Sequence, residues 1–131
     1  MPLRSASCSC GQLHLTVSGE PLRVSVCHCL ACQRRTGSAF GVQVRFAKES
    51  ARISGQSSTY VRISDAANKL TFHFCPQCGS TVHYEVEGQE DRVAVPVGAF
   101  ADPAFPAPSF SVYERRMHNW VGLPEALEHL S

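Results

Sequence analysis

The sequence lacks several features by which common classes of protein are recognised. Lysine and arginine (12) nearly balance aspartate and glutamate (11), giving a net charge of +1, and no basic tail or patch is present. No window approaches the continuous apolar length that a membrane-spanning helix needs. We therefore expect neither a nucleic-acid partner nor association with a membrane.

Signals for targeting and for several common catalytic mechanisms are also missing. The sequence shows no convincing Ser/His/Asp arrangement, phosphate-binding loop or pair of carboxylates. The first seven residues carry a positive charge but no apolar run follows them, which argues against a secretory signal and favours a cytoplasmic protein. A length of 131 residues with 44% hydrophobic and 18% charged residues, and with no visible boundary, predicts a single folded domain over residues 1–131.

Against this background, the seven cysteines are the most informative feature. They form three tight clusters, which are Cys8-Ser9-Cys10-Gly11, Cys27-His28-Cys29-Leu30-Ala31-Cys32 and Cys75-Pro76-Gln77-Cys78-Gly79. In a reducing compartment, clustered cysteines indicate metal binding or catalysis rather than disulfides. A structural zinc takes four protein ligands, whereas a catalytic zinc keeps one position open. Seven cysteines divided four plus three therefore fit one closed site and one open site.

The two outer clusters predict the closed site. In the last cluster, the spacing lets two sulfurs converge within a turn, proline fixes φ on entry, and Gly79 tolerates positive φ on exit. Cys75 and Cys78 supply two ligands, and Cys8 and Cys10 are the natural second pair, so we expect a structural zinc on these four residues. The alternatives are buried thiols in the last cluster and exposed thiols in the first.

The middle cluster predicts the open site. Cys27 and Cys29 lie two residues apart on an extended chain, and Cys32 returns after one turn, so three sulfurs face one ion. His28 points away from them and is expected to support the site or lie at the surface. One alternative is a structural site completed by a histidine (His73, His83 or His118). Another is a redox pair formed by Cys29 and Cys32.

The rest of the pattern is mainly β. Alternating or extended apolar runs predict strands over Gln12–Ser18, Leu22–Val26, Phe40–Phe46, Thr59–Ile63, Lys69–Phe74, Thr81–Val86 and Arg92–Val97. Helix signals are few: a turn or two over Cys29–Arg35 ending at Gly37, and a short helix over Pro124–Leu130. The proline-rich segment Phe100–Pro108 predicts an irregular surface crossing.

The order of the three motifs resembles the glutathione-dependent formaldehyde-activating enzyme family, which includes centromere protein V. The stretch Arg34–Phe40 after the middle cluster, and Ser109–Trp120 followed by Val121, are also similar to that family. The resemblance implies an Mss4-like fold of small coiled antiparallel β-sheets around a structural zinc. By position, it places that zinc on Cys8, Cys10, Cys75 and Cys78, and a second zinc on the catalytic residues Cys27, Cys29 and Cys32.

The activity that the resemblance implies is the condensation of formaldehyde with glutathione to S-hydroxymethylglutathione, a carbon–sulfur lyase in reverse. Glutathione would be the co-substrate, and an open zinc could take its thiol and deprotonate it. The anionic co-substrate calls for cationic donors. Arg34 and Arg35 are the best placed, followed by Arg115 and Arg116, while the backbone at Gly37 and Ser38 could approach a peptide ligand.

Two other functions remain open from the sequence. The protein could bind glutathione conjugates or another small thiol without turning them over, or it could be a structural zinc protein that acts through protein partners. His118, Asn119 and Trp120 could cover a pocket, although a tryptophan packed in the core is the commoner case. No feature of the sequence indicates an oligomeric state.

Overall fold

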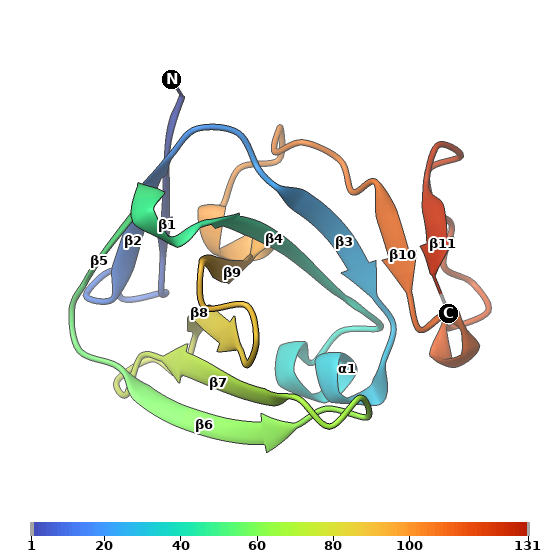
Figure 1. Cartoon of the computed structure of the whole chain (residues 1–131), viewed down its shortest axis with the longest axis horizontal. Helices are drawn as coiled ribbons and strands as arrows, with labels where there is room; N and C mark the ends of the chain where they lie inside the picture. The colour runs from blue at the N-terminus through green and yellow to red at the C-terminus, as the bar shows by residue number, and fades with distance from the viewer. Residues whose placement is uncertain (1, 131) are drawn as a thin grey trace.

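The structure is a computed structural model that describes residues 2–130 and consists mainly of β-strands with one short α-helix (Figure 1). The mainly β prediction is confirmed. The elements in chain order are β1 (Leu3–Ser7), β2 (His14–Ser18), β3 (Arg23–Cys27), α1 (Leu30–Thr36), β4 (Gly41–Ala47), η1 (Lys48–Ser50), β5 (Ala51–Ser54), β6 (Ser58–Ile63), β7 (Lys69–Phe74), β8 (Thr81–Val86), β9 (Arg92–Pro96), η2 (Val97–Phe100), β10 (Phe110–Val112), η3 (Glu114–Arg116) and β11 (Glu128–Leu130).

The strands form two sheets. One has three strands in the order β1-β2-β5, and the other has eight in the order β11-β10-β3-β4-β9-β8-β7-β6. The pairings are antiparallel except at one edge of the larger sheet, where β10 runs parallel to both β3 and β11. The larger sheet curls, so that α1 lies between its two ends (Figure 1). This curvature makes one face of the sheet concave and places distant strands around a common space.

The opposite face of the larger sheet packs against the smaller sheet and forms the main core. Along β4, Val44 and Phe46 point into this core and are fully buried, while Gln43 and Arg45, which alternate with them, point to the other face, as the two-residue period of a strand requires. Leu13 and Leu15 of the first hairpin meet them from the smaller sheet. Each large side chain buried in this way stabilises the fold by about 1.5–3 kcal/mol.

The helix α1 begins within the middle cysteine cluster, as predicted, and contains Cys32. The side chain of Cys29 caps its N-terminus by accepting a hydrogen bond from the backbone N–H of Cys32 at 3.3 Å. Gly37 ends it in the left-handed conformation (φ 69°), with its N–H donating to the carbonyl of Gln33. The Thr36 hydroxyl donates to the carbonyl of Cys32 at 2.9 Å. These contacts fix the turn that returns Cys32 toward Cys29.

Every strand predicted from the sequence is present, with ends shifted by two residues at most, and Phe100–Pro108 is largely irregular as expected. The predicted helix over Pro124–Leu130 is wrong, because the chain there forms a turn and then β11, which hydrogen-bonds to β10. The local sequence pattern also did not predict β1, β5, β10 and β11 as strands. Within residues 2–130, no helix has the length and apolar character to cross a membrane.

Candidate functional site

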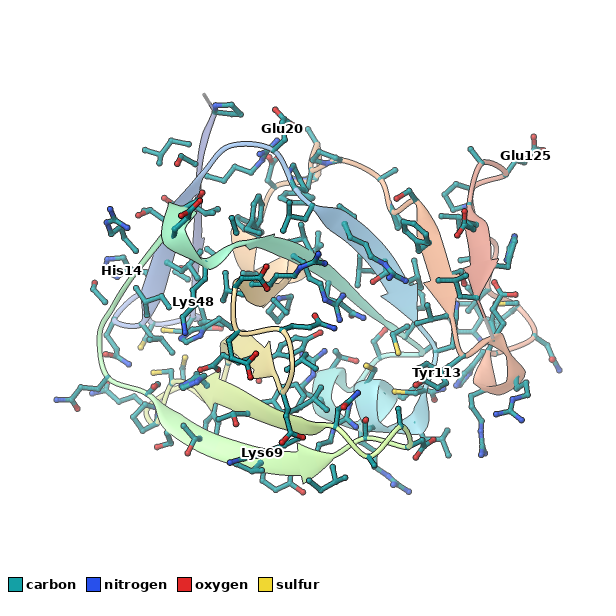
Figure 2. The ribbon with its side chains drawn as sticks, in the orientation of Figure 1. His14, Glu20, Lys48, Lys69, Tyr113 and Glu125 are labelled. Atoms are coloured by element: carbon teal, nitrogen blue, oxygen red, sulfur yellow. The ribbon has the colours of Figure 1, made fainter. Side chains whose placement is uncertain are left out.

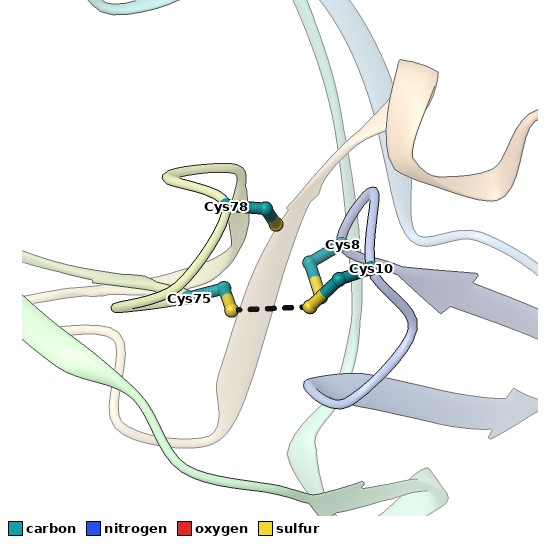
Figure 3. Close-up of side chains that lie close together, drawn as sticks. All are labelled: Cys8, Cys10, Cys75 and Cys78. Atoms are coloured by element: carbon teal, nitrogen blue, oxygen red, sulfur yellow. Dashed lines mark hydrogen bonds between the residues drawn. The ribbon is translucent and has the colours of Figure 1, made fainter.

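The two outer cysteine clusters meet in space. Figure 3 shows Cys8 and Cys10, from the turn between β1 and β2, facing Cys75 and Cys78, from the turn between β7 and β8. The four sulfur atoms all lie within 4.8 Å of one another. The Sγ atom of Cys10 is 3.6 Å from that of Cys8 and 3.7 Å from that of Cys75. The two clusters that were predicted from the sequence to combine therefore form one compact group of four sulfurs.

The two turns direct polar N–H groups at these sulfurs. The side-chain amide of Gln12 donates to the Sγ of Cys75 at 3.0 Å, and the backbone N–H of Leu13 donates to that of Cys8 at 3.4 Å. Gly79 adopts φ +83° after the second turn, as predicted from its position. Hydrogen bonds from the backbone N–H groups of Ser80 and Cys10 lower the pKa of Cys78 to about 5. These donors stabilise thiolates, which are the form that binds a metal.

The geometry of this group fits a zinc ion. Zinc bound by four thiolates at about 2.3 Å in a tetrahedron has sulfur–sulfur edges of about 3.8 Å. The two separations of 3.6 and 3.7 Å are close to that edge and far longer than a disulfide bond of about 2.05 Å. Cys8 and Cys75 are buried in the main core, so an ion held here would join the first hairpin to the β7–β8 turn.

The middle cluster forms a second group of three sulfurs, also within 4.8 Å of one another. Cys27 ends β3 and Cys32 lies in α1, and both are buried, whereas Cys29 at the helix N-terminus is partly exposed. Hydrogen bonds from Cys27 and then Cys32 lower the pKa of the Cys29 thiol, and the contact with Cys29 raises the pKa of Cys27. Of the three thiols, that of Cys29 is therefore the one whose deprotonated form its neighbours favour most.

His28 lies behind this cluster rather than at the surface. Its side chain is fully buried, and its Nε2 is 3.0 Å from the hydroxyl oxygen of Ser111 on β10. The carbonyl of His28 accepts a hydrogen bond from the side-chain amide of Gln33, which also donates to the carbonyl of Arg116. His28 therefore anchors the middle cluster to the strand that follows the proline-rich crossing.

Among the described residues, no histidine joins the three sulfurs of the middle cluster. His73 and His83 instead group with Glu85, and the Nε2 of His118 is 2.9 Å from the side-chain oxygen of Gln33. The structure therefore gives no support to a site completed by one of these histidines. Three sulfurs with no fourth ligand in the described part of the chain match the donor set of a zinc that keeps one position for another molecule.

The three sulfurs line a cavity of about 580 Å³ on the concave face of the larger sheet. Its walls come from alternate residues of several strands: Arg23, Ser25 and Cys27 on β3, Gln43 and Arg45 on β4, Tyr84 and Val86 on β8. At the edge of β10 the lining includes Tyr113, which is labelled in Figure 2. The volume lies in the range of cavities that hold small molecules.

The cavity is strongly cationic. Counted over residues 2–130, its lining contains six arginines (Arg23, Arg34, Arg45, Arg62, Arg115 and Arg116) against one acidic residue, Asp65. Two polar atoms of the lining, Arg23 Nε and Gln43 Oε1, are buried without a hydrogen-bond partner among the described residues. Buried polar groups of this kind are normally paired. The cavity is therefore suited to a small anionic ligand that carries several hydrogen-bonding groups.

Only some of the residues predicted from the sequence to form a ligand pocket line the cavity. Arg34, Arg115 and Arg116 line the cavity, whereas Arg35, Gly37 and Ser38 are not part of its lining. Arg35 instead packs over the rings of Phe72 and Tyr84, at 5.4 and 5.8 Å from their centroids. Trp120 is neither in the core nor in the lining, and 73% of its surface is exposed.

A family model described as glutathione-dependent formaldehyde-activating enzyme matches residues 3–116, which include all seven cysteines. The chain belongs to this family. Membership supports glutathione-dependent formaldehyde activation as the general class of function. The matched range also contains all six arginines of the cavity, and its last residue is one of them, Arg116.

Outside the family model, the comparisons concern the fold alone. A Rhodobacter sphaeroides protein of known crystal structure aligns with a TM-score of 0.56 at 20% identity, covering 72% of this chain and 85% of that one. No curated protein matches the chain. The fold of this family member is thus shared with a distant bacterial protein.

Three arginines of the cavity in this family member were not predicted from the sequence, namely Arg23, Arg45 and Arg62. Arg23 and Arg45 are direct partners in the β3–β4 register, and Arg62 pairs with Leu70 across β6 and β7. A signal was present in the sequence, since Arg23 and Arg45 occupy the polar positions of alternating strands on the side away from the core. Their convergence on one cavity depends on the curl of the sheet, which no local pattern reveals.

Proposed function

We propose that the protein joins the sulfur of glutathione to formaldehyde, giving S-hydroxymethylglutathione, and cleaves the same carbon–sulfur bond in reverse. One observation carries the proposal: three cysteine sulfurs, with no fourth ligand among residues 2–130, lie in the wall of a cavity lined by six arginines. Family membership adds the class of reaction. Glutathione has two carboxylates, one ammonium group and one thiol, so its charges and its sulfur match the two parts of this cavity.

The middle cluster supplies the chemistry of the thiol. Cys27, Cys29 and Cys32 would hold a zinc ion, which would keep a bound thiol deprotonated at neutral pH. The outer four cysteines would hold a second zinc for structure alone. This division follows from the donor sets and from the positions of the clusters, one in the wall of the cavity and one in the main core.

The arginines would bind and orient the co-substrate. Guanidinium groups pair with carboxylates through two parallel hydrogen bonds, which fix direction as well as position. The charge of Arg62 favours the thiolate of Cys29, and that of Arg35 favours the thiolate of Cys32. An anion held by Arg23 and Arg45 would lie along the β3–β4 floor of the cavity. Holding both reactants in one orientation lowers the entropic part of the barrier.

Proton transfer would complete the reaction. The thiolate sulfur attacks the carbonyl carbon of formaldehyde, the carbon–oxygen π bond opens, and the resulting alkoxide takes a proton. Tyr84 lines the cavity, and burial raises its pKa to about 12, so the phenol stays protonated at neutral pH and can donate. Water then reprotonates Tyr84. The thiol releases one proton to solvent and the alkoxide takes up one, so the reaction has no net change in protons.

The proposal is tested by exchange NMR on ¹³C-formaldehyde mixed with glutathione. The wild-type protein is expected to accelerate interconversion of formaldehyde hydrate and S-hydroxymethylglutathione above the uncatalysed rate. Cys29→Ser should abolish the acceleration. Arg52→Ala is the matched control for general surface changes, because Arg52 is exposed on β5 and lies outside the cavity. Glutathione binding without acceleration would contradict the enzymatic proposal and leave a thiol-binding module.

A further inference from the structure

A third group of potential metal ligands lies away from both cysteine clusters. His73 on β7 is the direct cross-strand partner of His83 on β8, and Glu85 follows two residues later. The ligand atoms of these three residues lie within 4.8 Å of one another. We refer to His73, His83 and Glu85 as the histidine cluster. The alternation of β8 places it on the face of the sheet opposite to Tyr84, so it does not belong to the arginine-lined cavity.

His73 is held in place by two contacts. Its Nε2 is 2.6 Å from a carboxylate oxygen of Glu85, and its Nδ1 is 3.4 Å from the hydroxyl oxygen of Ser57. Its ring also stacks on that of His83, with centroids 4.3 Å apart and planes 11° from parallel. The side chain of Glu85 is 36% exposed, so the cluster opens toward solvent on its carboxylate side.

His83 is the member of the cluster that is buried without a hydrogen-bond partner in residues 2–130. Only 5% of its surface is exposed, and neither of its ring nitrogens has a hydrogen-bond partner among the described residues. Leaving a buried polar group unpaired destabilises the folded state. A phenylalanine would fill similar space without that cost. The buried imidazole therefore indicates a partner that the polypeptide itself does not provide.

We propose that the histidine cluster binds one divalent first-row transition metal, such as Zn²⁺, as a third metal site. Two imidazoles and one carboxylate are the donors that such ions take, and the spacing suits one ion. Two ligands lie two residues apart on one strand, and therefore on one face, and the third lies directly across the neighbouring strand. The metal would give His83 the partner it lacks.

The local charge makes this site weaker than the cysteine sites. One carboxylate leaves a net charge of +1 once a divalent ion is bound. Lys48 of η1, labelled in Figure 2, opposes positive charge at His83. No thiolate contributes. The ion would therefore be bound reversibly and remain exchangeable, while a zinc in the four-sulfur site would stay in place.

Native mass spectrometry and calorimetry on the full, zinc-loaded chain test the proposal, with Zn²⁺ as the probe. The wild-type protein is expected to take one equivalent beyond those held by the cysteines. His83→Phe should lose this equivalent, and Glu85→Gln should weaken it at least about tenfold. Lys48→Met should tighten it. His14→Phe is the matched control, since His14 is a histidine of β2 outside the cluster.

The binding nitrogens can be followed directly by ¹⁵N NMR of the histidine rings. The proposal predicts that the extra equivalent shifts ring nitrogens of His73 and His83 together, and not those of His14. This readout does not depend on the fold of any variant. Absence of a further equivalent in the wild-type protein, or an equivalent that all variants bind with the same affinity, would overturn the proposal.

Discussion

Replacing one cysteine in each sulfur cluster should separate a structural site from an open one. Cys10→Ser and Cys29→Ser make the same chemical change at the second position of a Cys-x-Cys pair. Cys10 is exposed, so its replacement leaves no cavity. Serine is a favoured N-cap, so Cys29→Ser should preserve the start of α1. Differences in stability between these variants then report on the metal sites.

The magnitude follows from the length of chain that each site closes. The contact between Cys10 and Cys75 spans 65 residues. Closing a loop of that length is worth about 4 kcal/mol in the entropy model used for crosslinks. The middle cluster closes a segment of six residues, for which the same model gives about 2 kcal/mol. We therefore expect Cys10→Ser to lose about 2 kcal/mol more of the free energy of unfolding than Cys29→Ser.

Urea unfolding in zinc-containing buffer, with zinc per chain measured on the same samples, provides the assay. A loss of about 4 kcal/mol is a large part of the 5–15 kcal/mol typical of a folded domain, so Cys10→Ser should be partly unfolded or prone to aggregate. Cys29→Ser should stay folded with one zinc fewer in the cysteine clusters. Equal destabilisation of the two variants would refute the reasoning and make the middle cluster structural as well.

Three further predictions concern single side chains. Arg34→Ala should weaken glutathione binding in calorimetry without changing the midpoint of urea unfolding, because Arg34 lines the cavity. Arg35→Ala should instead lose about 1 kcal/mol of the free energy of unfolding, because its guanidinium packs over aromatic rings. The reverse pattern would contradict the placement of these two arginines. Ser111→Ala leaves the buried Nε2 of His28 without its partner and should cost about 1–3 kcal/mol in urea unfolding, so an unchanged midpoint would count against the buried contact. Trp120 is the sole tryptophan and is 73% exposed, so acrylamide should quench its fluorescence almost equally in the folded and unfolded protein; strong protection on folding would show that it is buried.

The sequence predicted those parts of the fold that rest on local patterns. Strands such as β4 were found because apolar residues alternate in register with the core. β5 was missed because only its first residue is even partly buried, so the segment shows no alternation. The helix predicted over Pro124–Leu130 is wrong because pairing with β10 overrides a weak local preference. Such pairing depends on a strand that lies elsewhere in the chain.

The candidate site shows the same limit. The cysteine clusters could be found from spacing alone, because metal ligands within one turn carry a recognisable pattern. Arg34 was found because it follows Cys32 closely in the chain. Arg35 is its neighbour but points into a packed aromatic layer, a difference that sequence proximity does not reveal. Arg62 reaches the cavity only because the sheet curls.

The central claim is that the three middle sulfurs hold an exchangeable zinc to which a thiol binds inside the cationic cavity. The most direct test is calorimetric titration of glutathione into the protein as purified, after mild chelation, and after zinc is restored, with zinc per chain measured at each stage. The account predicts that binding disappears with the exchangeable zinc and returns with it, while the protein stays folded. Binding that survives chelation unchanged, or no binding to the fully loaded protein, would contradict the claim.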